Sequence, residues 1–391
     1  MVFMDLKSRF VLIALLLLSL LPGLARPGVL RAGKGTLPSI TGPCGLVFPK
    51  DHGPHPEYGL EWWYYTGNLE DSSNRAFGFE LTFFRRRQPR PEGDEPPAEP
   101  SAWRTEQIWA AHCALTDIQG GVFHQHERTM RGALGLAGAE LDNRTWRFNV
   151  KNWRIVLGPA VHRLRACVPD LRIDLDLRPS KGPVLHGQAG YSRKGSRPSS
   201  ASCYVSFPRM EAAGRIRLKD RTFKVRGQAW MDHEFSSSLL EPDIEGWDWF
   251  GLQLDTGAEI MLFQLRREEG GRHPASAGSS IDPQGTVQQL RQADFDIEVL
   301  DVWQSPQTGI RYPSGWQLQI PILDLDLEIR PRLAEQEMLT QASSGMTYWE
   351  GSVTVAGRQG GTPVKGLGYV ELTGYGRSVG VLGRRPEEAS R

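Results

Sequence analysis

The second half of this 391-residue chain repeats its first half, and no other feature constrains the fold as strongly. Three segments of the first half recur in the same order in the second: residues 61–70 at 246–255, residues 173–179 at 323–331, and residues 225–232 at 364–371. This order predicts two copies of one unit, each too long to be a solenoid repeat. The function is then expected in a cavity of one unit or in the seam between the two.

Each unit carries the pattern of β-strands. Along residues 171–178 apolar side chains alternate with charged ones, which places them on opposite faces of an extended chain. The 43 glycines and 27 prolines provide turns that keep most strands short. The sequence therefore predicts an all-β protein of two tandem antiparallel β-barrels or sandwiches, spanning residues 40–238 and 239–383.

Residues 1–25 are expected to precede both units. Lys7 and Arg9 stand before an apolar run over residues 10–21, and the run is followed by small residues up to Ala25. This layout is typical of a signal peptide cleaved after Ala25, and the run is short for a membrane span. We therefore expect a secreted or periplasmic protein with no stable membrane span after cleavage. A retained N-terminal anchor is the alternative.

Charge and cysteine content narrow the function classes. The chain has 46 basic and 45 acidic residues, and removal of residues 1–25, which hold two basic and one acidic side chain, leaves 44 of each. Without a net positive field, nucleic acid is not an expected partner. The four cysteines, Cys44, Cys113, Cys167 and Cys203, are compatible with one or two disulfides in an exported protein, or with free buried thiols.

An acid stands among aromatic residues in the first repeated segment. If this segment is a strand, Glu61, Trp63 and Tyr65 share one face. Trp62 and Tyr64 then share the other face. An acid in an apolar barrel interior has a raised pKa and can hold a proton near neutral pH. The alternative is that the aromatic side chains are core and that an arginine or a backbone amide caps Glu61.

A second acidic segment closes the first unit. On a strand, Trp230, Asp232 and Glu234 share a face. Two carboxylates that repel each other on one face favour retention of a proton by one of them, which suits general acid catalysis. The alternative is a solvated strand end at the junction of the units, although Trp230 on the same face argues against full exposure.

Common catalytic and metal-binding patterns do not occur in the sequence. It contains no nucleophile elbow, no His-Glu-x-x-His motif and no phosphate-binding glycine loop. The histidine pairs have no third ligand at a fixed spacing: His52 with His55, His124 with His126, and His112 with His233. We therefore predict neither a metal site nor a cofactor.

Three segments carry a resemblance to a known family. They are the run from His52 to Leu69, which contains Glu-Trp-Trp-Tyr-Tyr-Thr-Gly, residues 230–237, which begin with Trp-Met-Asp, and residues 246–250, and together they resemble the AttH/CrtC lipocalin-like family. This family includes carotenoid 1,2-hydratases, and many members are labelled secreted hydrolases. The resemblance implies two lipocalin-like β-barrel domains. It also implies that Asp232 protonates a C=C bond, and that Trp230 stabilises the resulting cation. The residues after Asp232 differ from those expected of true carotenoid hydratases and are closer to AttH-type relatives.

Two functions follow as hypotheses. The first is acid-catalysed addition of water to an apolar, isoprenoid or lipid-like molecule, with Asp232 as the acid and Glu234 or Glu61 tuning its pKa. The second is a non-catalytic lipid carrier or chaperone that serves an envelope transport system. A scaffold for a protein complex is a third, weaker reading. The first two predict an aromatic ligand site, and only the first requires that Asp232 face the cavity with a raised pKa. The predicted ligand-binding side chains are Trp62, Trp63, Tyr64, Tyr65, His52, His55, Trp230, His233, Trp247 and Trp249.

Overall fold

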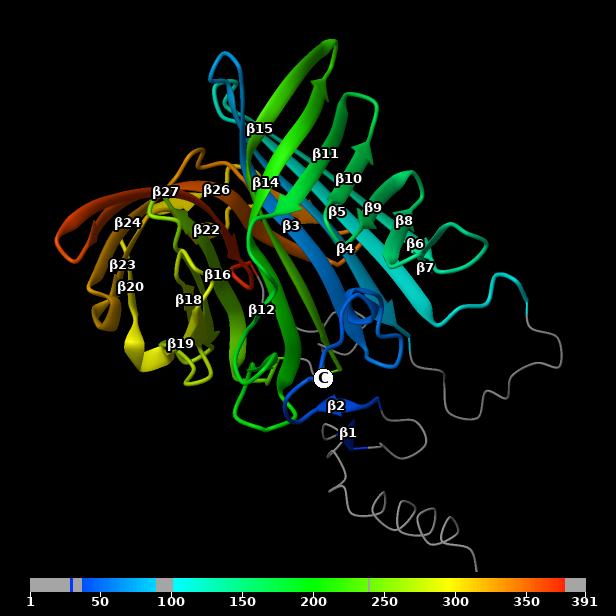
Figure 1. Cartoon of the computed structure of the whole chain (residues 1–391), viewed down its shortest axis with the longest axis horizontal. Coiled ribbons are helices and arrows are strands. Elements are labelled where there is room, and N and C mark those ends of the chain that lie inside the picture. Colours follow the sequence, from blue (N-terminus) through cyan, green and yellow to red (C-terminus); the bar gives the residue numbers. More distant parts are fainter. Residues whose placement is uncertain (1–28, 31–36, 89–100, 238–239, 377–391) are drawn as a thin grey trace, which may run out of the picture.

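A computed structural model describes residues 29–30, 37–88, 101–237 and 240–376 (Figure 1). The expected signal peptide and the expected unit boundary at Ser238 lie outside these residues. All regular elements in the described part are β-strands or short 3-10 turns. The protein is therefore all-β, with two antiparallel lipocalin-like sheets that curve toward barrels.

The first sheet is built from residues of the first half of the chain. Its main path runs β6 (Val122–Arg131), β5 (Gln107–Asp117), β4 (Ala76–Arg87), β3 (Leu60–Asp71), β15 (Arg221–Ser236), β14 (Ala201–Leu218), β11 (Leu171–Pro179), β10 (His162–Cys167), β9 (Trp153–Leu157), β8 (Thr145–Val150) and β7 (Ala137–Asp142). Two short strands, β12 (Val184–Leu185) and β13 (Tyr191–Arg193), also pair with β14. The sheet curves until β5 and β6 contact β8, so that its two ends approach each other.

The second sheet repeats this order. Its path runs β19 (Val287–Arg291), β18 (Ala277–Ile281), β17 (Glu259–Arg267), β16 (Ile244–Leu254), β27 (Thr362–Leu372), β26 (Met346–Gln359), β24 (Leu325–Pro331), β23 (Trp316–Ile320) and β20 (Asp296–Val299), with β25 (Glu337–Thr340) paired to β26. The three repeated sequence segments lie on the corresponding strand pairs β3 and β16, β11 and β24, and β15 and β27. The internal repeat in the sequence is therefore a repeat of strand order.

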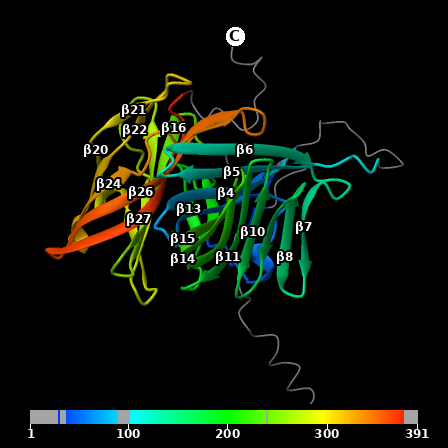
Figure 2. The same cartoon turned by 90° about the horizontal axis from the view of Figure 1, so that it is seen from above.

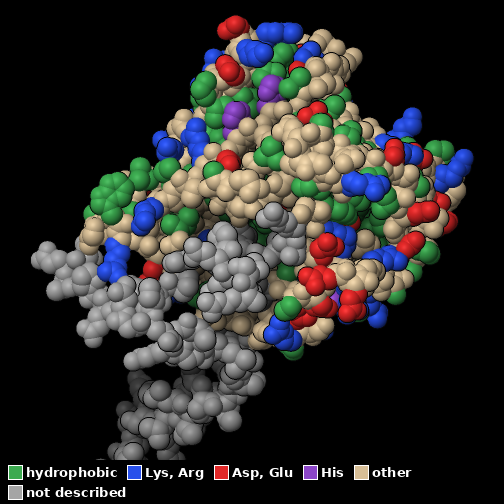
Figure 3. All heavy atoms as spheres, turned by 180° about the vertical axis from the view of Figure 1, so that it is seen from behind, with side chains coloured by type: hydrophobic (Ala, Val, Ile, Leu, Met, Phe, Trp, Pro, Cys, Tyr) green, Lys and Arg blue, Asp and Glu red, His purple; other side chains and the backbone are tan. Residues whose placement is uncertain are grey.

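The remaining elements are small. They are the strand pairs β1 (Val29–Leu30) with β2 (Ser39–Ile40) and β21 (Val302–Gln304) with β22 (Arg311–Pro313), and the turns η1 (Lys50–His52), η2 (Gln292–Asp294) and η3 (Pro321–Leu323). Among the described residues, no helix has the length and apolar character needed to cross a membrane. Basic and acidic side chains are interspersed on the face shown in Figure 3.

Each barrel interior is filled by its own side chains. In β11 the apolar residues Leu171, Ile173, Leu175 and Leu177 are all buried, while the charged residues between them point outward. Burial of one such leucine contributes roughly 1.5–3 kcal/mol to stability. Trp63 and Tyr65 belong to the same first core, and a separate core fills the second barrel. Space for a ligand is therefore to be sought outside the two cores.

The two barrels pack through the outer faces of their strands. Figure 2 shows β26 and β27 beside the first sheet, and β27 contacts β3 while β26 contacts β4. Asn68 joins them, because its amide donates to the Gly368 carbonyl over 3.0 Å and its carbonyl accepts from the Ser352 hydroxyl over 2.5 Å. Gly78 is needed at this contact, since a Cβ there would lie 2.7 Å from the Cβ of Ser352.

One disulfide is present in the described part of the chain. Cys44 is bonded to Cys203, whereas Cys113 is a buried thiol and Cys167 a half-buried one. The sequence left the number of disulfides open. The bond fastens the segment before β3 to strand β14, and it thereby holds His52 and His55 against the first barrel.

Candidate active site

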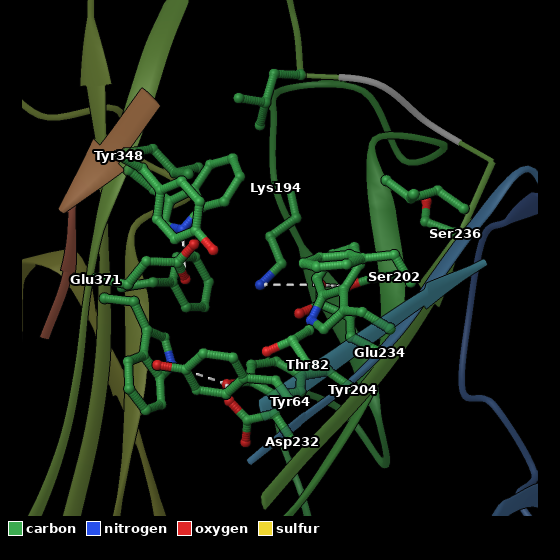
Figure 4. Close-up of a pocket in the computed structure, with 18 of the residues that line it drawn as sticks. Tyr64, Thr82, Lys194, Ser202, Tyr204, Asp232, Glu234, Ser236, Tyr348 and Glu371 are labelled. Carbon is green, nitrogen blue, oxygen red and sulfur yellow. Dashed lines mark hydrogen bonds and ion pairs between the residues drawn. The ribbon is translucent and has the colours of Figure 1, made fainter. Parts of the chain in front are cut away.

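A cavity of about 160 Å³ lies in the seam between the barrels (Figure 4). This is the size of cavity that accommodates a single aromatic ring. Strands β3, β4, β14 and β15 form one wall, and strands β16, β17, β26 and β27 form the other. The walls present equivalent residues of the repeat: Trp62 with Trp247, Tyr64 with Trp249, and Asp232 with Glu371.

The alternation of the strands decides which side chains reach this cavity. On β3, Trp62 and Tyr64 point into the seam while Trp63 and Tyr65 point into the first core, as the pattern predicts. On β15, Asp232 and Glu234 line the cavity, whereas His233 lies on the opposite face. A one-residue shift in either strand would exchange the two sets.

Asp232 is the most heavily hydrogen-bonded acid of the cavity. It accepts from the Trp230 indole over 2.6 Å, from the Tyr204 hydroxyl over 2.7 Å, and from the Ser206 hydroxyl. Burial nonetheless raises its pKa to about 7, because the desolvation of the carboxylate outweighs these hydrogen bonds and Glu234 adds repulsion. Asp232 can therefore both hold and release a proton near neutral pH. Trp230 does not line the cavity and acts as a donor to Asp232.

Among the described residues that line the cavity, Glu234 is the one acid that faces a cation. Its Oε1 lies 3.3 Å from Lys194 Nζ and accepts a hydrogen bond from the Ser202 hydroxyl. The ammonium also lies 3.7 Å from the ring centre of Phe263 and 4.7 Å from that of Tyr204. These contacts fix Lys194 at the edge of the cavity (Figure 4).

The second barrel contributes two more acids. Burial raises the pKa of Glu371 to about 7, with added repulsion from Asp232 and Glu234 and one opposing donor, the Trp247 indole at 3.3 Å. Burial, together with repulsion from Glu371 and Glu80, raises the pKa of Glu350 well above its ordinary value. Glu350 Oε1 accepts from the Tyr64 hydroxyl over 2.6 Å, and its Oε2 has no hydrogen-bond partner among the described residues.

Glu61 lies on the far side of β3, and the prediction that its pKa is raised is wrong. Its carboxylate meets Arg85 Nε at 2.8 Å, His55 Nδ1 at 2.8 Å and His233 Nε2 at 2.9 Å. Although burial opposes ionisation, the hydrogen bonds and charges of His233 and His55 lower the pKa of Glu61. Although burial opposes it, the hydrogen bonds and charges of Asp51 and Glu61 raise the pKa of His55 to about 9. The alternative given above is the one found, because Arg85 and the backbone N–H of His55, at 2.8 Å, both cap Glu61.

The predicted ligand-binding residues are divided by this strand pair. Trp62, Tyr64, Trp247 and Trp249 line the cavity. The others do not, because they lie on the barrel side of β3 and β15 or in the segment that covers it: Trp63, Tyr65, His52, His55 and His233. Their predicted role in ligand binding is therefore not supported by this cavity and stays a prediction.

The histidines around Glu61 have the spacing of a metal site. The ligand atoms of His55, Glu61 and His233 lie within 4.8 Å of one another. However, both histidines already contact Glu61, and the guanidinium of Arg85 occupies its other oxygen. A cation added there would face Arg85, so this cluster fits a structural ion network better than a metal centre.

Comparison with known proteins places this geometry in a family. The model of the AttH-like family matches residues 39–375. The chain belongs to the AttH-like family. A crystal structure of an AttH protein from Nitrosomonas europaea is 32% identical, with a TM-score of 0.73, and the match covers 84% of this chain and 97% of that one.

One sequence relative and one structural neighbour of this AttH-like protein are named as enzymes that remove or add water. The dehydratase asqC of Emericella nidulans is 23% identical over 217 residues, which cover 54% of this chain and 60% of that protein. The crystal structure of kievitone hydratase from Nectria haematococca shares the fold, with 16% identity, a TM-score of 0.63, and coverage of 89% of this chain and 97% of that one.

Several residues of the cavity were missed by the sequence analysis. Glu371 could have been found, because the repeat aligns it with Asp232. Glu350 and Lys194 carried no such signal, since neither belongs to a repeated segment or a motif. Only the packing of β26 and of the loop after β13 brings them to the cavity.

Proposed function

We propose that this AttH-like protein is a hydratase or dehydratase that moves water onto or off an apolar substrate held in the seam cavity. One observation carries the proposal: two buried acids from opposite walls, Asp232 and Glu371, face the same aromatic cavity, each with a pKa of about 7. Removal of water requires an acid at the leaving hydroxyl and a base at the neighbouring C–H bond. Two carboxyl groups that titrate near neutral pH can supply both.

The roles follow from the surroundings of the two acids. Asp232 protonates the leaving hydroxyl in dehydration, and its three donors stabilise the carboxylate that remains. Glu371 has fewer donors and removes the proton from carbon. In hydration the same steps run in reverse, with Glu371 protonating carbon and Asp232 activating water. A structural neighbour named as a hydratase and a sequence relative named as a dehydratase are consistent with either direction.

The test uses water labelled with heavy oxygen. The protein is incubated with alcohols that carry one aromatic ring, and with the matching alkenes, and label in the alcohol is measured by mass spectrometry. We expect Asp232→Asn to lower the rate by roughly 10²–10⁴-fold. Asp220→Asn, an exposed residue of the same β14–β15 hairpin, is the control and keeps the activity. A bell-shaped dependence of rate on pH centred near 7 is expected as well.

The rival proposal is a carrier for an apolar molecule, favoured by the aromatic walls of the cavity. It predicts a stoichiometric ligand in the protein purified from its host, with no exchange of label in the wild type. Export is part of both proposals. The signal-like segment at residues 1–25 and the Cys44–Cys203 disulfide, a bond typical of oxidising compartments, support it.

A further inference from the structure

Lys194 is the one cationic side chain among the described residues that line the cavity. It follows β13, and its backbone N–H donates to the Ser200 carbonyl over 2.7 Å, which closes the loop that carries it. The side chain is only 20% exposed, and its Nζ is held between Glu234 and the faces of Tyr204 and Phe263. A lysine in such surroundings is positioned much more firmly than a surface lysine.

The ammonium of Lys194 has more N–H donors than the surrounding residues have acceptors for it. It carries three N–H bonds, and Glu234 Oε1 at 3.3 Å is the acceptor that the described residues offer it. The aromatic faces stabilise its charge but accept no proton in a conventional hydrogen bond. An oxygen atom of a bound molecule would complete the set.

We propose that Lys194 binds a carbonyl oxygen, and that the substrates are therefore β-hydroxy carbonyl compounds and their α,β-unsaturated products. This inference rests on the proposed function and names its substrate class. It differs from the isolated C=C bond that the resemblance to carotenoid hydratases implied.

The sign of the charge is the reason. Protonation of an isolated alkene creates a positive charge on the substrate, and a nearby ammonium raises the energy of that charge in a cavity of low dielectric. Removal of a proton beside a carbonyl creates a negative charge on oxygen, which the same ammonium stabilises. Lys194 thus favours the enolate route over the carbocation route.

The steps of this route balance. Glu371 takes the proton from the carbon next to the carbonyl, and the electron pair of the C–H bond moves to give an enolate whose oxygen lies on Lys194. The C–O bond to the β-hydroxyl then breaks as Asp232 donates its proton, which releases water. The C=C bond forms and the C=O bond is restored. Glu371 has gained one proton and Asp232 has lost one, and exchange with water resets both.

A binding experiment tests the inference independently of turnover. Benzylacetone and butylbenzene share a ring and a four-carbon chain and differ by the ketone oxygen. Binding of each is followed by quenching of tryptophan fluorescence, since Trp62, Trp247 and Trp249 line the cavity. The wild type is expected to bind the ketone roughly tenfold or more tightly than the hydrocarbon, and Lys194→Met to lose this preference. Lys194→Arg should retain part of it, and the exposed Lys224→Met should retain all of it.

Lys194→Met and its control Lys224→Met are then compared in turnover. The aldol of benzaldehyde and acetone is compared with the phenylbutanol that lacks the ketone oxygen. We expect Lys194→Met to reduce dehydration of the aldol by roughly 10²–10³-fold in kcat. Equal binding of benzylacetone and butylbenzene by the wild type, or an unchanged preference in Lys194→Met, overturns the inference. Dehydration of the phenylbutanol as fast as the aldol also overturns it but leaves the proposed function intact. Absence of any turnover, with the ketone preference present, overturns the proposed function instead.

Discussion

The β3–β15 strand pair buries acids on its two faces, Glu61 of β3 on the barrel side and Asp232 of β15 on the seam side, and the two environments shift their pKa values in opposite directions. On the barrel side, Glu61 meets one guanidinium and two imidazoles, and its pKa is lowered. On the seam side, Asp232 meets only neutral donors, and its pKa is raised to about 7. Burial is nearly complete in both cases. The charge of the partners, rather than depth, therefore decides the sign of the shift.

The comparison also separates stability from function. The network around Glu61 satisfies its charge, so it stabilises the fold and leaves no group ready to exchange a proton. The seam acids Asp232, Glu350 and Glu371 face no cation among the described residues, so their burial costs stability when they are charged and keeps protons available at the cavity. Sites of this second kind are where chemistry is expected.

The largest effect on stability is expected at the barrel side. Glu61→Gln removes the negative charge that faces Arg85 and leaves that guanidinium buried without a carboxylate. The expected loss of unfolding free energy is roughly 3–5 kcal/mol, measured by urea denaturation. Glu70→Gln, on the exposed end of the same strand, is the control and should change little. A loss below 1 kcal/mol for Glu61→Gln would show that the network is dispensable.

The dependence of stability on pH provides the second test. The pKa of Glu371 in the folded protein, about 7, exceeds the ordinary value of 4.5, so its stabilising contribution is complete below pH 4.5 and is lost as the pH rises through 7. Glu371→Gln carries no charge to bury and should gain stability relative to the wild type above pH 7. The gain is at most on the order of 3 kcal/mol.

Thermal unfolding from pH 5 to 9 measures this gain. Glu298→Gln, at an exposed position of β20, should follow the wild type at every pH. The contribution of Glu61 depends on pH with the opposite sign. Because its pKa is lowered in the folded protein, Glu61 stabilises the fold at pH values above its ordinary pKa, and this contribution is lost in acid. Parallel curves for the wild type and Glu371→Gln would contradict the difference between the two faces.

The smallest effect is expected from a hydrogen bond within the seam. Tyr64→Phe removes the hydroxyl that donates to Glu350 over 2.6 Å. The expected cost is about 1 kcal/mol of unfolding free energy. The cost should grow with pH, because Glu350 loses a donor that favours its charged form. Tyr191→Phe, which removes a hydroxyl that donates to the exposed Pro198 carbonyl, is the matched control.

The local pattern of the sequence was sufficient for the fold and for one wall of the cavity. Alternation along β3 and β15 assigned Trp62, Tyr64, Asp232 and Glu234 to particular faces, since the two-residue period of a strand is a local property. The repeat likewise predicted two sheets with the same strand order. It also aligns Glu371 with Asp232, which indicates that Glu371 lies at the equivalent position of the second sheet.

Tertiary structure alone decided the environment of each acid. Glu61 is charged because β4 brings Arg85 beside it and the segment before β3 brings His55, and neither contact has a signature in sequence. The cavity forms where the outer faces of the two barrels meet. This packing brings Glu350 and Glu371 to Asp232, which is more than a hundred positions away in the sequence, and it brings Lys194 there from a separate loop. Sequence sets the direction of a side chain through local geometry, but a pKa depends on every charge and dipole within a few ångströms, and only the packed fold defines that set.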